Sequence, residues 1–257
     1  MHLDGKVVLI TGASEGIGAA CAAEFAGAGA RLSLTARSAE GLARAGGTSA
    51  LITVGDLTLE ATRRQAVERT LEKFGAIDVL INNAGIGLYG PSWSTSMEDA
   101  RRLMELNFFA LLGMIQLVAP HMRKRRSGTI VNVSSIGGKM PLPWMTLYSA
   151  SKYAVTGLTE GLRMELRADG VKTLLACPGY VTTGFQQNVL TGQAPASVVR
   201  ARRQAITPAE CAHAIRRGVE RDARTILAPK AGWVLVAMAR LFPRLVEARM
   251  AQMNGTA

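Results

Sequence analysis

The stretch KVVLITGASEGIG, residues 6–18, joins a short apolar run to a loop that contains three glycines. Lys6–Thr11 is almost entirely apolar and rich in β-branched residues, the pattern of a strand buried on both faces. Ala19–Ala28 follows with the composition of a helix. Glycines between a strand and a helix permit a tight turn, and they let the backbone and the helix N-terminus approach a pyrophosphate. The stretch therefore predicts a dinucleotide-binding strand–loop–helix unit.

The remaining chain repeats this alternation of apolar strands and amphipathic helices. Strands are expected at Arg31–Thr35, Ala50–Val54, Asp78–Asn82, Thr129–Ser134, Val171–Cys177 and Arg224–Ala228. Helices are expected at Ser38–Ala45, Thr58–Phe74, Ser96–Met122 and Tyr148–Ala168 and from Thr207 onward, with Thr58, Ser96 and Thr207 as N-caps. Such alternation implies a parallel sheet with helices on both faces and right-handed crossovers. We predict an α/β fold: one doubly wound, Rossmann-type domain over residues 1–257, with about seven strands.

Composition bounds the class of protein. The chain is 48% hydrophobic and 19% charged, which indicates a folded domain with a large core. Its three cysteines are far apart, so we expect reduced thiols in a cytoplasmic protein and no metal site. No signal peptide is expected at the N-terminus. The formal charge of +11 fits an arginine-coated surface, an acidic ligand or a membrane surface; no nucleic-acid partner is expected, because no aromatic stacking platform accompanies the basic residues.

The end of the second strand bears on the choice of cofactor. NAD sites place a carboxylate there for the ribose 2′-hydroxyl, whereas NADP sites use an arginine for the 2′-phosphate. Here the strand ends in Ala36-Arg37, and a guanidinium can bind a phosphate through two parallel hydrogen bonds. We predict NADP(H), with NAD(H) as the alternative because Glu15 is an unfavourable neighbour for a phosphate. Arg37 could also be an ordinary surface residue.

Polar residues follow the third and fourth strands as well. Asp56 either accepts a hydrogen bond from an adenine amino group or forms a turn before Thr58. Asn83 and Gly85 suit an adenosine-binding wall, or simple turn chemistry. In a doubly wound sheet both segments would lie at the ligand-binding edge.

Tyr148 and Lys152 lie four residues apart in the predicted helix after the fifth strand and so share a face. An apolar row is expected to face the core from the opposite side: Ala150, Ala154, Leu158, Leu162 and Leu166. A phenol titrates near pH ~10, and a nearby ammonium together with a cationic nicotinamide ring would lower its pKa toward neutrality. Tyr148 is therefore a candidate acid/base for a carbonyl or an alcohol.

Two other polar positions support this site. Ser134 and Ser135 end the fifth strand, where a hydroxyl can donate to a carbonyl oxygen or simply close the strand. Asn107 lies within the apolar stretch Leu106–Ala110. A buried amide needs partners, so Asn107 is expected to bend its helix or hold a water.

These motifs together resemble the short-chain dehydrogenase/reductase family, in its short single-domain branch. Thr11–Gly18 matches its TGxxxGIG motif, Asn82–Gly85 its NNAG, Tyr148 and Lys152 its YxxxK, and Pro178–Thr183 its PGxVxT. Ser135 precedes the tyrosine by 13 residues, the usual spacing in the family, and Asn107 completes the tetrad. The resemblance covers about residues 4 to 184.

The resemblance implies a role for each matching residue. Tyr148 exchanges the proton, Lys152 lowers its pKa and binds the nicotinamide ribose, Ser135 orients the substrate oxygen, and Asn107 holds a water that links Lys152 to solvent. Val181 and Thr183 hold the nicotinamide carboxamide. The full cofactor-binding set is Gly12, Ser14, Glu15, Gly16, Ile17, Gly18, Arg37, Asp56, Leu57, Asn83, Ala84, Gly85, Tyr148, Lys152, Pro178, Gly179, Val181 and Thr183. A non-catalytic NADP sensor is the alternative function.

The chain departs from well-known family members after a core that spans about residues 4–228. Lys230–Met253 is apolar and basic, and Pro243 is expected to break it. This extension resembles the tails of reductases that act on lipophilic substrates, and it could cover the pocket, form a dimer contact or lie on a membrane. A homodimer or homotetramer through the helices 96–122 and 148–168 is expected.

An apolar ketone, aldehyde or secondary alcohol is the expected substrate, of a lipid, steroid or ketoacyl kind. Specificity is expected from three segments, Ile86–Trp93, Gly138–Met145 and 185–205. The side chains that they would contribute are Leu88, Tyr89, Trp93, Met140, Trp144, Met145 and Phe185.

Overall fold

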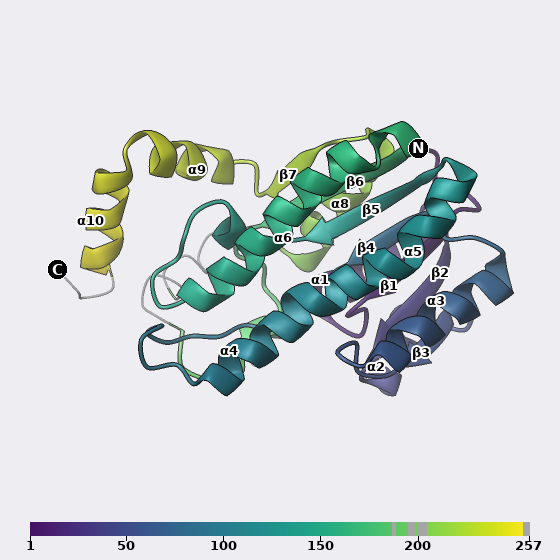
Figure 1. Cartoon of the computed structure of the whole chain (residues 1–257), viewed down its shortest axis with the longest axis horizontal. Helices are drawn as coiled ribbons and strands as arrows, with labels where there is room; N and C mark the ends of the chain where they lie inside the picture. Colours follow the sequence, from purple (N-terminus) through teal and green to yellow (C-terminus); the bar gives the residue numbers. More distant parts are fainter. Residues whose placement is uncertain (187–188, 195–198, 200–204, 254–257) are drawn as a thin grey trace.

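The computed structural model describes residues 1–186, 189–194, 199 and 205–253. Seven parallel strands form one sheet in the order β3-β2-β1-β4-β5-β6-β7, which confirms the predicted doubly wound fold (Figure 1). The strands are β1 (Val7–Thr11), β2 (Arg31–Ala36), β3 (Leu51–Val54), β4 (Val79–Asn82), β5 (Gly128–Val133), β6 (Val171–Pro178) and β7 (Thr225–Ala228). The strand order reverses between β1 and β4, so the loops that leave these two strands diverge and open a crevice at their carboxyl ends.

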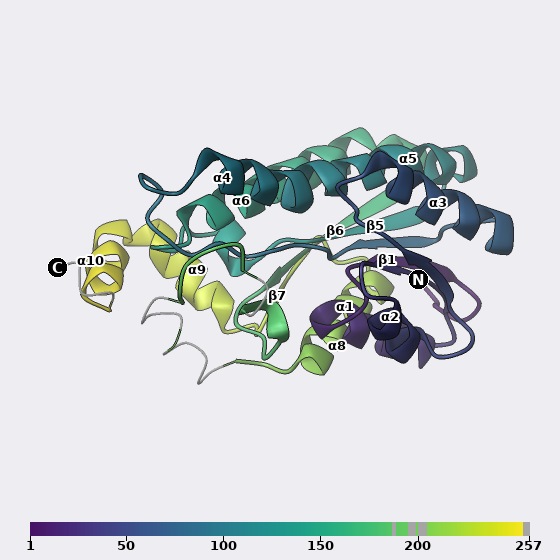
Figure 2. The ribbon, with the colours of Figure 1, turned by 90° about the horizontal axis from the view of Figure 1, so that it is seen from below.

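Helices cover both faces of the sheet (Figure 2). One face carries α1 (Gly16–Ala26), α2 (Ala39–Gly46) and α8 (Pro208–Glu220), and the other carries α3 (Glu60–Phe74), α4 (Met97–Met104), α5 (Leu111–Arg125) and α6 (Thr146–Glu165). Two separate hydrophobic clusters fill the layers. Phe25 and Ile215 are fully buried on the first face, and Val118 and Val155 on the second. Burial on both sides explains why the strands read as continuous apolar runs.

The predicted strands agree with the structure to within one residue at each end, whereas α1, α3 and α6 start two or three residues away from their predicted starts, and one predicted N-cap is wrong. Thr58 is not the N-cap of α3, because Leu59 holds that position. Instead, Oδ1 of Asp56 accepts hydrogen bonds from the backbone N–H and the hydroxyl of Thr58, both at 2.9 Å. This local turn delays the helix. Ser96 and Thr207 are N-caps as predicted, and Thr207 forms a complete capping box with Glu210.

The predicted helix 96–122 is interrupted. A π-helical turn, η1 (Glu105–Ala110), separates α4 from α5 and contains Asn107. The stretch Met97–Arg125 is long and apolar enough to cross a membrane by composition alone, yet 44% of its most apolar window is buried. Met114 and Val118 pack with the sheet residues Leu80 and Ile130. These contacts are those of a core helix in a globular fold.

The predicted core row of α6 is partly wrong. Ala150 is exposed, and Ala154 and Leu158 are only partly buried, while Leu162 and Leu166 are buried as expected. The buried face of α6 consists instead mainly of Ser151, Lys152, Val155, Thr156 and Thr159. Hydroxyl groups are tolerated there because they bond to nearby backbone: Ser151 donates to the carbonyl of Tyr148 at 2.7 Å and Thr159 to that of Val155 at 2.6 Å.

The C-terminal extension forms two helices, α9 (Gly232–Leu241) and α10 (Pro243–Met253), and Pro243 separates them as predicted. They stand at one end of the molecule beyond β7 (Figure 1). Val236 is buried against Ile136, Met140 and Leu227, and Val246 and Met250 pack on the same cluster. One side of the extension is thus attached to the body of the domain.

Candidate active site

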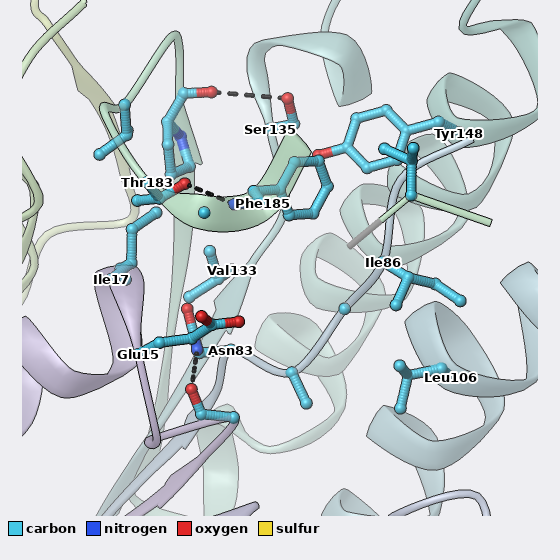
Figure 3. Close-up of a pocket in the computed structure, with 18 of the residues that line it drawn as sticks. Glu15, Ile17, Asn83, Ile86, Leu106, Val133, Ser135, Tyr148, Thr183 and Phe185 are labelled. Carbon is cyan, nitrogen blue, oxygen red and sulfur yellow. Dashed lines mark hydrogen bonds between the residues drawn. The ribbon is translucent and has the colours of Figure 1, made fainter. Parts of the chain in front are cut away.

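A cavity of about 880 Å³ lies at the carboxyl ends of the strands, where the order reverses (Figure 3). It extends from the ends of β2 and β3, past the glycine loop, to the start of α6. The sequence-predicted residues are brought together here: every assigned cofactor-binding residue lines the cavity except Gly18. Ser135 lines it too, and Asn107 lies just behind its wall.

The glycine loop, residues 12–18, forms the floor of this cavity. Gly12 has φ +64°, and a Cβ there would lie 2.8 Å from Cα of Ala84, so only glycine fits between the two loops. Gly16 has φ +56° and abuts Thr183. Gly18 acts differently from the prediction: a Cβ there would lie 2.1 Å from the carbonyl oxygen of Gly12. Gly18 therefore allows α1 to approach the strand, and the start of α1 faces the cavity, as pyrophosphate binding requires.

Asn83 and Thr11 tie the glycine loop to the end of β4. The amide of Asn83 donates to the carbonyl oxygens of Thr11 and Gly12, both at 3.1 Å. The hydroxyl oxygen of Thr11 accepts from the backbone N–H groups of Asn83 at 3.0 Å and Ala84 at 3.2 Å. Asn83 thus forms the turn and also lines the cavity, where its role in binding adenosine stays a prediction.

Two guanidinium groups line the end of the cavity beside β2. Arg37 follows the strand, and Ser38 caps α2 by accepting from the backbone N–H of Gly41 at 3.0 Å. Arg44, one helical turn beyond Gly41, lines the cavity as well and was missed from the sequence. Its signal was the helical spacing: Gly41 packs on Ser14 of the glycine loop, and a residue three positions later shares that face.

Three further segments line the cavity. Asp56 and Leu57 line it at the end of β3, where Asp56 also forms the turn described above. Pro178, Gly179, Val181 and Thr183 line it after β6, and Thr183 accepts from the backbone N–H of Phe185 at 3.3 Å (Figure 3). Leu106 and Arg102, from η1 and α4, complete it and were not predicted.

Tyr148, Lys152 and Ser135 converge beside the apolar end of the cavity. All three are buried, and Nζ of Lys152 lies 5.8 Å from the centre of the Tyr148 ring. The Lys152 ammonium donates to the carbonyl oxygen of Val133 at 3.0 Å. Figure 3 shows the Tyr148 phenol pointing toward the Ser135 hydroxyl. An acid, a hydrogen-bond donor and a cation therefore meet at one point.

Burial controls the protonation of these groups. It raises the pKa of Tyr148 to about 12, although the hydrogen bond with Ser135 lowers it. Burial also lowers the pKa of Lys152 to about 8. The side chains of the protein alone therefore do not produce the expected lowering of the Tyr148 pKa, because the cost of removing a phenolate from water outweighs the hydrogen bond with Ser135. At neutral pH the phenol is protonated and the lysine is mostly charged.

Asn107 holds the loop after β4 against α6. Its Oδ1 accepts from the backbone N–H of Ile86 at 2.9 Å, and its Nδ2 donates to the Ile86 carbonyl at 3.0 Å and to the Ser151 hydroxyl at 3.1 Å. A Cβ on Gly85 would lie 3.1 Å from Oδ1 of Asn107 and 3.4 Å from Nζ of Lys152. The π-helical turn thus carries a fully buried amide to a position next to Lys152.

The end of the cavity beside Tyr148, where the substrate is expected, has a largely apolar lining, but several side chains assigned to it do not line it. Tyr89, Met145 and Phe185 do, together with Ile136, Leu142, Val189 and Leu190. Leu88 and Met140 are buried in the core, and Trp93 is exposed and packs on Trp144 with ring centres 5.8 Å apart. Part of the third predicted segment, residues 187–188, 195–198 and 200–204, lies outside the described residues.

Comparison with known proteins gives consistent matches. A family model for short chain dehydrogenases matches residues 6–194. A dehydrogenase/reductase SDR family protein 7-like from Anopheles gambiae is 33% identical over 99% of this chain and 86% of its own length. A 3-ketodihydrosphingosine reductase from Bacteroides thetaiotaomicron is 40% identical over 73% of this chain and 70% of its own.

Solved structures agree with the sequence matches. A short chain dehydrogenase/reductase from Burkholderia phymatum in complex with NAD has a TM-score of 0.85 and 29% identity, covering 95% of this chain and 96% of that one. A short chain dehydrogenase from Burkholderia cenocepacia in complex with NADP has a TM-score of 0.82 and 28% identity, covering 97% and 99%. Both nicotinamide cofactors thus occur on closely similar folds.

Proposed function

The chain belongs to the short-chain dehydrogenase/reductase family, and from that premise we propose that it transfers hydride between NADP(H) and the carbonyl or secondary alcohol carbon of an apolar substrate. The observation that carries the proposal is the position of Tyr148, Ser135 and Lys152 in this cavity. They lie between the part lined by the glycine loop and the apolar end. The cavity is large enough for a dinucleotide. Its glycine loop also suits one, because the loop lies close to Ala84 where a side chain at Gly12 would collide.

The proton chemistry follows from the positions of these groups. In reduction, Tyr148 donates its phenolic proton to the carbonyl oxygen, and the Ser135 hydroxyl donates a hydrogen bond to the same atom. In oxidation, the phenolate accepts the proton of the alcohol. When bound, the nicotinamide cofactor supplies the hydride in one direction and accepts it in the other. Because burial keeps the pKa of Tyr148 at about 12, reduction is the direction for which the protein alone is already protonated correctly.

Lys152 acts on Tyr148 through its charge. Its ammonium, held by the Val133 carbonyl, stabilises negative charge on the phenol, and it is also placed to bind the nicotinamide ribose. We propose that Asn107 positions Lys152 through a water that links the ammonium to solvent. Its bonds to Ile86 and Ser151 fix the amide beside Gly85 for that role.

The arginines at the end of β2 are the reason to prefer NADP(H). Arg37 and Arg44 both line the adenosine end of the cavity, where two guanidinium groups would surround a 2′-phosphate. Glu15 and Asp56, which also line the cavity, oppose this preference. Each guanidinium can form two parallel hydrogen bonds with a phosphate, which a 2′-hydroxyl cannot match, and this geometry favours the phosphorylated cofactor.

An apolar substrate is supported by the aromatic and aliphatic lining at the far end of the cavity. Tyr89, Met145 and Phe185 enclose the space next to Tyr148, and Tyr148 contacts Phe185 edge-on with ring centres 5.8 Å apart. The relative from Bacteroides thetaiotaomicron is named for the reduction of 3-ketodihydrosphingosine, a lipid ketone. We propose a lipophilic ketone or aldehyde of comparable character.

We also propose that the enzyme is a cytoplasmic homodimer or homotetramer that assembles through the helices 96–122 and 148–168. Phe109, Tyr153 and Met164 are exposed there, and a Cβ at Gly157 or Gly161 would meet nothing within 4 Å. A neighbouring helix could approach this smooth surface closely. Analytical ultracentrifugation of Gly161→Arg tests this assignment: dissociation to monomers supports it, and an unchanged mass contradicts it.

The proposed reaction is tested by fluorescence titration with NADPH and NADH, followed by turnover of apolar ketones. Selective NADPH binding with turnover is the expected result. Tight NADPH binding without turnover of ketones, aldehydes or alcohols would instead favour the non-catalytic sensor. Binding of neither nucleotide would contradict the proposal.

A further inference from the structure

The outer side of α9 and α10 exposes large apolar side chains. We call this surface the C-terminal patch; it consists of Trp233, Val234, Leu235, Leu241, Phe242 and Leu245, all exposed. Leu241 is 71% exposed and Val234 68%. Leu241, Phe242 and Leu245 also line a shallow apolar hollow at the junction of the two helices. Exposed apolar groups gathered on one element mark an interaction surface.

The charge around the patch is positive. Lys230, Arg240, Arg244 and Arg249 are the cations of the segment 230–253, and Glu247 is its only carboxylate. Arg240 lies close enough to Glu160 of α6 to lower the pKa of that carboxyl, whereas within the described residues no salt bridge joins Lys230, Arg244 or Arg249 to an acidic side chain. The chain as a whole carries a formal charge of +11. A partner for this surface must therefore accept apolar side chains and neutralise several positive charges.

The other side of α9 and α10 packs beside the substrate end of the cavity. Val236 and Ala239 of α9 and Val246 and Met250 of α10 share a cluster with Ile136 and Leu142. Ile136 and Leu142 also line the cavity near Tyr148. Figures 1 and 2 both place the two helices at one end of the molecule, away from α2, α3 and β3. Any partner that binds the C-terminal patch is therefore held close to the substrate end of the cavity.

A second copy of the chain fits the patch poorly. Symmetric pairing brings the same surface of two protomers together, so two surfaces of net positive charge would face each other. An anionic bilayer meets both requirements, because its interface takes up tryptophan and aliphatic side chains while its headgroups attract arginine and lysine. Charge complementarity therefore selects the lipid surface.

We propose that the C-terminal patch docks the protein on an anionic lipid surface, with the substrate end of the cavity turned toward that surface. The patch and its cations carry this inference without any reliance on the proposed reaction. If the reaction is as proposed, the docking gives the apolar chamber direct access to a substrate dissolved in the membrane.

Cosedimentation of the full chain with vesicles tests the proposal. The protein should bind vesicles of phosphatidylcholine and phosphatidylserine, bind pure phosphatidylcholine vesicles much more weakly, and be released by added salt. Leu241→Glu should weaken binding at least about tenfold, since it removes a leucine that the bilayer would bury and adds a charge that the anionic surface repels. Arg244→Gln should weaken it about fivefold, as expected for one cation near an anionic surface.

A matched control and an optical signal sharpen the test. Leu59→Glu makes the same exchange at an exposed leucine before α3, at the far end of the molecule, and should bind like the parent. In a Trp93→Phe/Trp144→Phe variant, Trp233 is the remaining tryptophan, and its emission should shift to the blue on binding phosphatidylserine vesicles.

Several results would overturn the proposal. Absence of binding to either vesicle, equal binding to both, or equal losses in Leu241→Glu and Leu59→Glu would each do so. A change in oligomeric mass in Leu241→Glu with unchanged vesicle binding would assign the patch to a second copy instead. Turnover of a water-soluble ketone without vesicles is measured separately, so a failure of the proposed reaction is distinguishable from a failure of docking.

Discussion

The side-chain amide of Asn107 forms two hydrogen bonds with the backbone of a single residue, Ile86: it accepts from the N–H at 2.9 Å and donates to the carbonyl at 3.0 Å. Ile86 belongs to the loop that lines the cavity after β4, and Asn107 belongs to a π-helical turn. These two hydrogen bonds therefore fix the loop after β4 relative to the helix that carries Asn107.

Replacing Asn107 with leucine should destabilise the protein and disturb the site. Ile86 would keep its partly buried backbone groups without their partners, at a cost of about 2 kcal/mol in urea unfolding. Asn132→Leu is the matched control, since Asn132 is equally buried but bonds to Asn82 and Thr159 away from the cavity. Both variants should lose stability, and turnover measured below the unfolding transition should fall markedly further in Asn107→Leu. Equal losses of turnover in the two variants would show that Asn107 has no role in the active site beyond stability.

Tyr148→Phe should lower kcat about 100-fold or more, because it removes the proton donor while keeping the ring. NADPH affinity by fluorescence titration should stay nearly unchanged. Tyr153→Phe, one residue beyond Lys152 on the exposed side of α6, should retain full activity. Substantial turnover in Tyr148→Phe would show that another group exchanges the proton.

Arg37→Ala and Arg44→Ala should each weaken NADPH binding about 10- to 100-fold, the loss expected for one charged hydrogen-bonding group at a phosphate. NADH binding should change little. Arg64→Ala, which removes an exposed arginine paired with Glu60 on α3, controls for the change in overall charge. Equal losses for the two cofactors would contradict a 2′-phosphate site.

The two reaction directions should differ in their dependence on pH. Oxidation needs the Tyr148 phenolate, whose fraction rises about tenfold per pH unit while the pH lies below the phenol pKa. Reduction needs the phenol, so its rate should stay nearly flat from pH ~6 to ~8 with respect to this group. Initial rates of kcat/KM in both directions test this. A reduction rate that falls steeply in that range would mean that Tyr148 titrates near neutrality in the free enzyme.

Lys152 should make the stability of the protein without cofactor rise with alkaline pH. Its folded pKa of about 8 lies below the ordinary lysine value of 10.5, so between these values the unfolded chain binds more protons and stability increases with pH. From pH ~7.5 to ~9.5 the gain should reach about 2 kcal/mol relative to Lys152→Met. The opposite effect of Tyr148 begins only above the ordinary tyrosine value of 10.0. Parallel pH profiles for parent and variant in urea unfolding would show that Lys152 titrates normally.

The fold and most of the site could be predicted from the sequence because the strands are buried on both faces. A run such as Val7–Thr11 is apolar throughout, and the residues that follow each strand necessarily meet at one edge. Asn107 could be singled out for a related reason, since an amide in an apolar helix demands a local change in structure.

The errors arose where local hydrogen bonding changed the meaning of a residue. The core face of α6 is rich in serine and threonine, whose hydroxyls bond to the helix backbone, so the apolar residues of α6 predict the wrong side for the core. Asp56 bonds to Thr58 and displaced a helix start. Trp93 and Trp144 pack against each other outside the cavity, and no spacing in the sequence indicates this pairing.

The hydrogen bonds between Asn83, Thr11 and Gly12 have a consequence for the energetics of cofactor capture. Because these bonds join the two loops within the protein itself, the entropy of ordering them is lost during folding and not at the moment of binding. The nucleotide meets a preorganised surface, so its affinity reflects its contacts with little deduction for loop ordering.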